Sequence, residues 1–294
     1  MLFNPIEGKI ATTSTVAADD SQPAIALKTA CIDGQDICYF DSGDGPVLLL
    51  IHGMYGDHTD WEPVLRPLAE HHRVIALDLP GFGLSSKPHV DYSADFFVSA
   101  LEAFLKHLEV PKAIFVGNSF GGIICMLYAL AHPERTSGLV LIDSGGFYEW
   151  SPQEREDAQS RFRKERLRKL SPEIHRRLFG SIFVNGPSSV ASAYMSKQDK
   201  KLIRADFEQY VHAIHSSVQL ALDEVLLDRL PEIKCPVLIL QGAKDEIVKM
   251  EWVKEGASRF LNAQMKVVDD CGHVPQLESP QEVVRLMSEF MSKL

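Results

Sequence analysis

Short apolar runs alternate with amphipathic stretches along most of the chain. Six runs have the length and the flanking turn residues of buried strands. Residues 26–33 and 37–41 flank Gly34 and predict a hairpin, and residues 93–108 place apolar side chains on one helical face. Strands that are apolar on both faces and separated by helices predict an α/β fold with a mostly parallel sheet and helices on both faces. The six runs are residues 47–51, 73–77, 114–116, 139–142, 237–240 and 265–268.

The middle of the chain, residues 148–228, is charged and helical in periodicity and contains no strand-like run. Ser151-Pro152-Gln153-Glu154 is a capping box, and Ser171-Pro172 indicates a second helix start of the same kind. Strand and helix then alternate again, and Ser279-Pro280-Gln281-Glu282 predicts the cap of a last helix. We predict three parts: an N-terminal arm at residues 1–24, a core formed by residues 25–147 and 229–294, and an inserted helical cap, or lid, at residues 148–228.

One stretch has the layout of a nucleophile elbow. The run that ends at Val116 is followed by Gly117-Asn118-Ser119-Phe120-Gly121-Gly122, and an apolar, helix-like segment begins at Ile123. Strand, tight turn and helix in this order hold a nucleophile in a strained backbone, and small residues must flank it because strand and helix pass close together. Ser119 would then lie at the carboxyl end of a strand, where open α/β sheets bind ligands. The alternative is a glycine-rich turn with an incidental serine.

A serine nucleophile needs a base, and the base needs an acid that orients it. His273 is the candidate base, since it follows the last predicted strand in a loop with glycine and proline. Asp245 is the candidate acid, just past the strand at residues 237–240. Asp143 and Glu246 are its rivals.

The oxyanion of an acyl-transfer reaction needs two backbone N–H donors aimed at one point. We expect one from Phe120, which starts the helix after the candidate nucleophile, and one from Met54, in the loop after the first buried run. Gly53 and Gly56 let that loop come close. His52 is expected to hold the loop rather than to react.

Five motifs, in this order along the chain, resemble those of the α/β-hydrolase superfamily, and most closely those of its compact bacterial esterases and carbon–carbon bond hydrolases. The resemblance covers about residues 25–294 except the cap. It implies the α/β-hydrolase fold, with Ser119 as nucleophile, Asp245 as acid, His273 as base and the Met54 and Phe120 N–H groups as oxyanion donors. The motifs are His52-Gly53, Asp78-Leu79-Pro80-Gly81-Phe82-Gly83-Leu84-Ser85, Gly117-Asn118-Ser119-Phe120-Gly121-Gly122, Gly242-Ala243-Lys244-Asp245 and Gly272-His273-Val274-Pro275.

Two details of the motifs bear on the reaction. Dehalogenases and epoxide hydrolases of this superfamily use aspartate as nucleophile, so Ser119 argues against both. The Gly-Asn-Ser form resembles meta-cleavage product hydrolases, but those usually carry tryptophan after the catalytic histidine, where this chain has Val274. We therefore predict a serine hydrolase that cleaves carboxylic esters through an acyl-enzyme. The alternatives are a carbon–carbon bond hydrolase of the meta-cleavage product type and a non-catalytic, ligand-sensing hydrolase fold.

Aromatic and aliphatic residues in and beside the cap are candidates for a substrate pocket. They would favour a small-molecule substrate with an apolar acyl or alcohol group. The alternative is ordinary packing of the cap on the core. The candidate pocket residues are Phe147, Tyr148, Phe183, Tyr194 and Val274.

Composition excludes several other functions. The net charge of -10 repels nucleic-acid phosphates, the apolar runs are far too short to cross a bilayer, and five scattered cysteines without Cys-x-x-Cys indicate neither disulfides nor a thiolate metal site. We expect no cofactor, because residues 81–86 lack the third glycine of a dinucleotide loop. The expected location is cytoplasmic, and the oligomeric state stays open.

Histidines and basic residues of the cap need a separate explanation. His212 and His215 are three positions apart on a helix without an evident third ligand, so we predict no metal site. Residues 161–177 carry eight Lys or Arg and two Glu, which favours either a solvated helix or attraction of an anionic substrate or membrane. Five other histidines are expected to be solvated: His71, His72, His89, His107 and His175.

Overall fold

The computed structural model describes residues 26–184 and 188–294. The predicted N-terminal arm therefore lies outside the described residues. An eight-stranded sheet runs through the molecule in the order β1-β2-β4-β3-β5-β6-β7-β8. The strands are β1 (Leu27–Ile32), β2 (Gln35–Ser42), β3 (Val47–Ile51), β4 (Arg73–Leu77), β5 (Ala113–Asn118), β6 (Thr136–Ile142), β7 (Val237–Gly242) and β8 (Ala263–Val268).

The pairing of the strands confirms the predicted hairpin and the mostly parallel sheet. β1 pairs antiparallel with β2, with Ile32 opposite Gln35 across the turn, and β2 pairs antiparallel with β4. Every other pair is parallel, from β4 with β3 to β7 with β8. The carboxyl ends of β3, β5, β6, β7 and β8 therefore lie along one edge of the sheet, and every candidate catalytic residue follows one of these strands.

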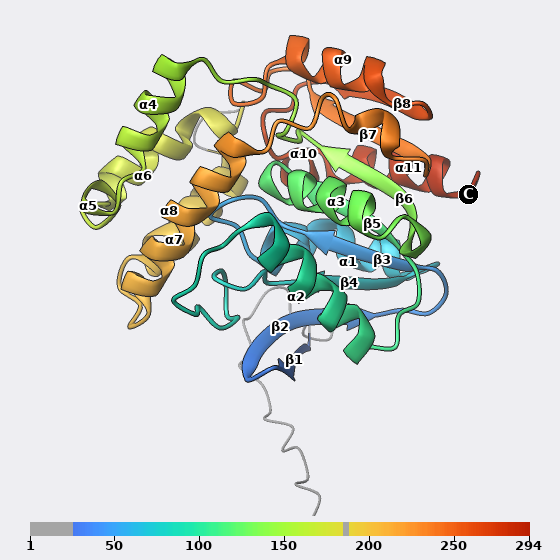
Figure 1. The fold of residues 1–294 in the computed structure, drawn as a ribbon, viewed down its shortest axis with the longest axis horizontal. Coiled ribbons are helices and arrows are strands. Elements are labelled where there is room, and N and C mark those ends of the chain that lie inside the picture. The colour runs from blue at the N-terminus through green and yellow to red at the C-terminus, as the bar shows by residue number, and fades with distance from the viewer. Residues whose placement is uncertain (1–25, 185–187) are drawn as a thin grey trace, which may run out of the picture.

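Alternate residues of the central strands face two separate cores. Leu49 and Ile51 belong to the core beneath α2 (Ala94–His107), α3 (Phe120–Ala131) and α9 (Met250–Arg259). Leu48 and Leu50 belong to the core beneath α1 (Glu62–Ala69) and α11 (Pro280–Met291). In Figure 1, α2 and α3 lie in front of the sheet and α11 behind it. Because each strand is buried on both faces, its sequence reads as a continuous apolar run.

Five helices between β6 and β7 lie together at one side of the sheet (Figure 1). We call them the cap helices. The division of the chain into a core and a cap domain stays a prediction. Within the described residues, no helix combines the length and the apolar character needed to cross a membrane. The cap helices are α4 (Pro152–Arg161), α5 (Lys164–Leu167), α6 (Pro172–Phe179), α7 (Ser189–Lys201) and α8 (Phe207–Asp223), with the short η3 (Gly180–Ile182) after α6.

All three predicted serines stand at the N-cap of a helix, and two of them cap it through their side chains. Ser151 accepts from the Glu154 N–H and completes a capping box, and Ser171 accepts from the Ile174 N–H. Ser279 is the N-cap residue of α11, as predicted, but its side chain makes no capping hydrogen bond there. Ser279 also ends the short helix α10 (Pro275–Glu278), and its side chain interacts with the Cys271 thiol instead.

Candidate active site

Ser119 lies in a strained turn between β5 and α3. Its φ of 53° and ψ of -115° place a non-glycine residue in a sparsely populated region. Its N–H donates to the Ile142 carbonyl at 2.9 Å, and its own carbonyl accepts from Gly122 and Gly145. β6 and the loop that follows it thus hold the turn from both sides of Ser119, and the strain is fixed by the surrounding backbone.

Gly121 has no space for a side chain. A Cβ there would overlap the carbonyl oxygens of Ile51 and His52. We expect Gly121→Ala to lower the free energy of unfolding by about 3 kcal/mol or more, because backbone rather than a flexible side chain must move. Gly180→Ala is the matched control, since a Cβ at Gly180 meets nothing within 4 Å. Urea unfolding of both variants tests this, and equal midpoints would contradict it.

His273 and Asp245 meet at the carboxyl edge of the sheet. His273 Nδ1 lies 2.8 Å from Asp245 Oδ2, and Asp245 Oδ1 accepts from the N–H groups of Ile247 and Val248 at 2.7 and 3.1 Å. Burial raises the pKa of the Asp245 carboxyl, but His273 and the two amides lower it by more, so its pKa lies below the ordinary value. Because an ionised carboxylate only accepts hydrogen bonds, Nδ1 carries the ring proton and Nε2 is left as the basic nitrogen.

The two rival acids have other surroundings, and Asp143 lies directly beside Asp245. Asp143 is fully buried and accepts from the Gly242 N–H at 2.8 Å. Burial, and then the neighbouring Asp245 charge, raise the pKa of Asp143 well above its ordinary value. Glu246 lines the cavity described below. Among the described residues, neither of these side chains has a hydrogen bond to His273.

Asn118, whose role the sequence analysis missed, holds the histidine loop. Its Nδ2 donates to the carbonyl oxygens of His273 and Ile142, both at 3.1 Å. The His273 N–H donates to Ile182 in η3 at 2.8 Å, and Glu278 accepts from the N–H groups of Gly272 and Val184. The core and the cap side of the chain therefore both fix the histidine loop. The sequence did contain a signal for this role, namely a side chain able to form hydrogen bonds directly before the candidate nucleophile.

The loop after β3 brings Met54 to the same carboxyl edge of the sheet. Gly56 N–H donates to the Gly53 carbonyl at 3.0 Å and closes a tight turn around Met54. His52 is fully buried; its Nε2 accepts from the Leu79 N–H at 3.1 Å, and its Nδ1 donates to the Gly53 carbonyl at 2.8 Å. Burial lowers the pKa of His52 below its ordinary value, so the ring is neutral. Its hydrogen bonds give it the architectural role expected from the sequence.

A cavity of about 610 Å³ contains Ser119 and His273 in its wall, together with Met54 and Phe120. Four of the five candidate pocket residues also line it: Phe147, Tyr148, Tyr194 and Val274.

Phe183 does not line this cavity. Its ring packs edge-on against Tyr194, with centroids 5.4 Å apart, so it supports the wall from behind. The sequence analysis missed other lining residues, among them Asp60, Trp252 and Lys249. Trp252 stacks on Tyr148 with centroids 4.0 Å apart, a contact between segments far apart in the sequence.

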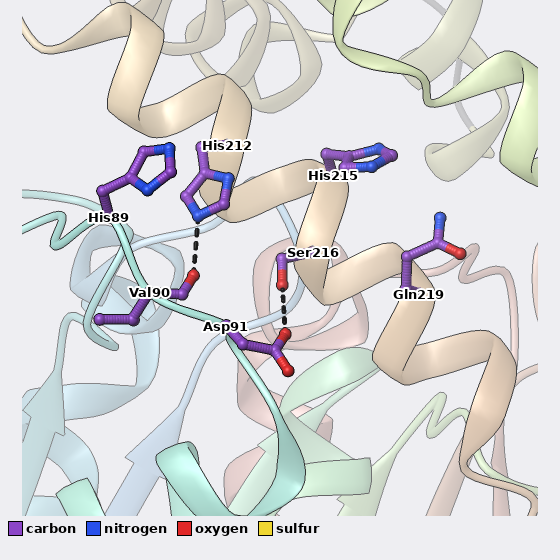
Figure 2. A pocket seen from close by; sticks show the side chains of 7 residues that line it. All are labelled: His89, Val90, Asp91, His212, His215, Ser216 and Gln219. Atoms are coloured by element: carbon purple, nitrogen blue, oxygen red, sulfur yellow. Dashed lines mark hydrogen bonds between the residues drawn. The ribbon is translucent and has the colours of Figure 1, made fainter.

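A second, open groove lies between α8 and the loop before α2 (Figure 2). The His89 and His212 rings stack in it with centroids 4.1 Å apart. His212 Nε2 donates to the Val90 carbonyl at 2.7 Å, and its Nδ1 accepts from Lys164 at 2.8 Å, so neither ring nitrogen is free. Among residues 26–184 and 188–294, no group of three or more His, Cys, Asp or Glu side chains is placed to hold a metal ion.

One histidine prediction is wrong. His175, expected to be solvated, is buried in the cap. Its Nδ1 lies 3.0 Å from Asp199 Oδ1, which supplies the polar partner that makes burial possible.

The fold and the site together define an α/β hydrolase: the strained serine turn follows β5, and the histidine and its aspartate follow later strands of the same sheet. A family model described as the alpha/beta hydrolase fold matches residues 46–280. The chain therefore belongs to this family and is a hydrolase. The family and the fold class expected from the five motifs are both confirmed.

The names of the relatives describe different reactions. The chain is 31% identical over 263 residues to a 2-hydroxymuconate semialdehyde hydrolase of Pseudomonas sp. (strain CF600), covering 86% of this chain and 89% of the relative. It is 30% identical to Lipase 1 of Psychrobacter immobilis, covering 89% and 82%. Among solved structures, a thermophilic esterase from Thermogutta terrifontis superposes with a TM-score of 0.78 at 25% identity, covering 91% of this chain and 98% of the esterase.

Proposed function

We propose that this protein is a serine hydrolase that cleaves neutral carboxylic esters through an acyl-enzyme. The observation that carries the proposal is a cavity whose wall contains both Ser119 and His273, with His273 bonded to Asp245. No metal or redox group takes part in this chemistry, because a hydroxyl, an imidazole and backbone N–H groups are sufficient for acyl transfer.

The proposed reaction has two halves. His273 Nε2 takes the proton of the Ser119 hydroxyl while Oγ bonds to the ester carbonyl carbon. The oxyanion accepts from the N–H groups of Met54 and Phe120, for which no other acceptor is found among the described residues. The tetrahedral intermediate then releases the alcohol, whose oxygen takes the proton from His273. Water, deprotonated by His273, next attacks the acyl carbon, the carboxylic acid leaves, and Ser119 Oγ regains its proton.

Charges around the cavity support a neutral substrate. Four carboxylates line it, against one arginine and one lysine. Asp60 is the buried one of the four and is paired with Lys197, whereas the other three carboxylates are exposed. Apart from Asp60, three carboxylates face one arginine and one lysine, so a substrate carboxylate would meet a small excess of negative charge, and like charges brought together disfavour binding. The ionisable lining groups, apart from His273, are Asp60, Glu154, Asp157, Glu246, Arg161 and Lys249.

Carbon–carbon bond hydrolysis is the second candidate, favoured by the relative named 2-hydroxymuconate semialdehyde hydrolase. The name of that relative describes an acid as substrate. An excess of negative charge in the cavity therefore favours the neutral ester over the acid. Decay of a dienolate absorbance in the visible range, at a rate above that of ester hydrolysis, would favour carbon–carbon cleavage.

A pair of esters of matched length tests the proposal. We expect kcat/KM for p-nitrophenyl butyrate to exceed that for the p-nitrophenyl monoester of succinate by about tenfold or more, because the free carboxylate is repelled. A fluorophosphonate should label the wild-type protein at Ser119, identified by peptide mass. Faster turnover of the anionic ester would contradict the neutral-substrate proposal, and absence of labelling would contradict the serine mechanism.

A further inference from the structure

Two lysines of α7 reach from the cap into the loop that carries Met54. Lys201 Nζ lies 2.9 Å from Asp57 Oδ2 and also donates to the Tyr55 carbonyl. Lys197 Nζ donates to Thr59 Oγ1 at 2.9 Å, to Asp57 Oδ1 at 3.2 Å and to Asp60. About 140 positions separate these lysines from the loop in the sequence.

This cluster is buried and balanced in charge. Asp57, Asp60 and Lys201 are each less than 9% exposed. Burial alone would raise the pKa of Asp57, but the charges of Lys201 and Lys197 hold it well below its ordinary value, so the carboxylate is ionised. Two ammonium groups therefore face two carboxylates. Buried ion pairs of this kind add little net stability compared with apolar packing, so stability alone is a weak explanation for them.

The position of the cluster indicates that it fixes the backbone conformation of the loop that carries Met54. Tyr55 has a φ of 65°, which is strained for an aromatic residue. Such a conformation persists only where its surroundings fix it. The core fixes the loop at Gly53, through His52 and Gly56, and Lys201 fixes it at the Tyr55 carbonyl. Met54 lies between these two anchors.

We propose that Lys201, with Asp57, is a positioning residue that aims the Met54 N–H at the oxyanion. This inference rests on the serine mechanism proposed above. The cap thereby completes the oxyanion site of the core, and Lys201 acts through the Tyr55 carbonyl without touching the substrate. η3 holds the histidine loop in a parallel way, since the Ile182 carbonyl accepts from the His273 N–H.

Lys201→Met tests the proposal with p-nitrophenyl butyrate as substrate. An oxyanion donor acts in the transition state and not in the bound ester, so kcat should fall by about 10–100-fold while KM stays within about twofold. The affinity for a trifluoromethyl ketone, which forms a tetrahedral adduct with the serine, should fall by the same factor as kcat. A role confined to stability would lower the melting temperature and leave both quantities unchanged.

Two further variants keep the experiment decisive. Lys200→Met is the matched control, because Lys200 is exposed on the same helix and no ion pair to it is found among the described residues. The double variant Lys201→Met/Asp57→Asn leaves Lys197 facing Asp60, so no unpaired charge remains buried, and it should fold while keeping the low kcat. A folded double variant with wild-type kcat and inhibitor affinity would overturn the positioning role. A wild-type protein that neither hydrolyses esters nor reacts with a fluorophosphonate would overturn the serine mechanism as well.

Discussion

Replacing Ser119 with alanine is expected to lower kcat/KM for p-nitrophenyl butyrate by about 10⁴–10⁶-fold, the loss typical when a serine nucleophile is removed. Alanine keeps the Cβ and therefore tolerates the φ of 53° as well as serine does. The backbone bonds from Ser119 to Ile142, Gly122 and Gly145 do not involve the hydroxyl. The variant should thus fold normally, and its melting temperature should match the wild type within a few degrees.

Ser144→Ala is the matched control for this experiment. Ser144 lines the same cavity and is buried, but its hydroxyl donates to the neighbouring Gly145 carbonyl at 3.0 Å. We expect this variant to keep its activity within about tenfold, since it removes a hydroxyl without a nucleophilic role. If Ser119→Ala still hydrolysed esters substantially and still took up label from a fluorophosphonate, another residue would have to be the nucleophile.

Asp245→Asn is expected to have the second largest effect, a fall in kcat of about 10³–10⁴-fold, because an amide can present an N–H to His273 Nδ1 and so favour the wrong ring tautomer. The 2.8 Å contact between His273 Nδ1 and Asp245 Oδ2 is the only polar contact of that ring nitrogen found among the described residues. Loss of the carboxylate also removes the charge that stabilises the imidazolium in the transition state. Steady-state kinetics at pH 7 measures the change.

Asp143→Asn distinguishes the two neighbouring acids. Burial raises the pKa of Asp143 and so favours its neutral form, which an amide resembles in shape and charge, and we expect kcat to stay within about tenfold. A larger loss for Asp143→Asn than for Asp245→Asn would assign the orienting role to Asp143.

The lowered pKa of Asp245 also predicts a dependence of stability on pH. A carboxyl whose folded-state pKa is depressed stabilises the fold above its unfolded value, about 3.9, and this contribution is lost as the pH falls through the folded value. The free energy of unfolding should therefore fall less steeply below about pH 4 in Asp245→Asn than in the wild type. Urea unfolding between pH 3 and 6 compares the two slopes.

The sequence was sufficient for the sheet and for the catalytic candidates because both depend on local signals. Leu48 to Ile51 are buried on both faces, and that burial appears in the sequence as an unbroken apolar run. Gly121 signals the close approach of α3 to β3, since only glycine fits there. The ends of parallel strands share one edge of the sheet, so residues that follow different strands were expected to meet.

Other features depend on contacts between distant segments and have no local signal. Lys197 and Lys201 are spaced like solvated residues of a charged helix, and only the folded chain places them against Asp57 and Asp60. His175 lies in a strongly basic segment and is nevertheless buried, because Asp199 approaches it from α7. The choice between Asp143 and Asp245 likewise required knowing which carboxylate faces the imidazole.

The insertion of the cap helices between β6 and β7 has a consequence for how this protein can evolve. Leu139 pairs with Val237, so one strand contact closes a loop of roughly 100 residues. The entropy of closing a loop grows only with the logarithm of its length, and lengthening a short crossover of about 12 residues to this size costs on the order of 2 kcal/mol. Cap segments of very different length and sequence can therefore be exchanged at this junction while Ser119 and Asp245 keep their places after β5 and β7. New substrate preferences are accessible without rebuilding the chemistry, provided that a new cap also supplies the anchors that Lys201 and Ile182 provide here.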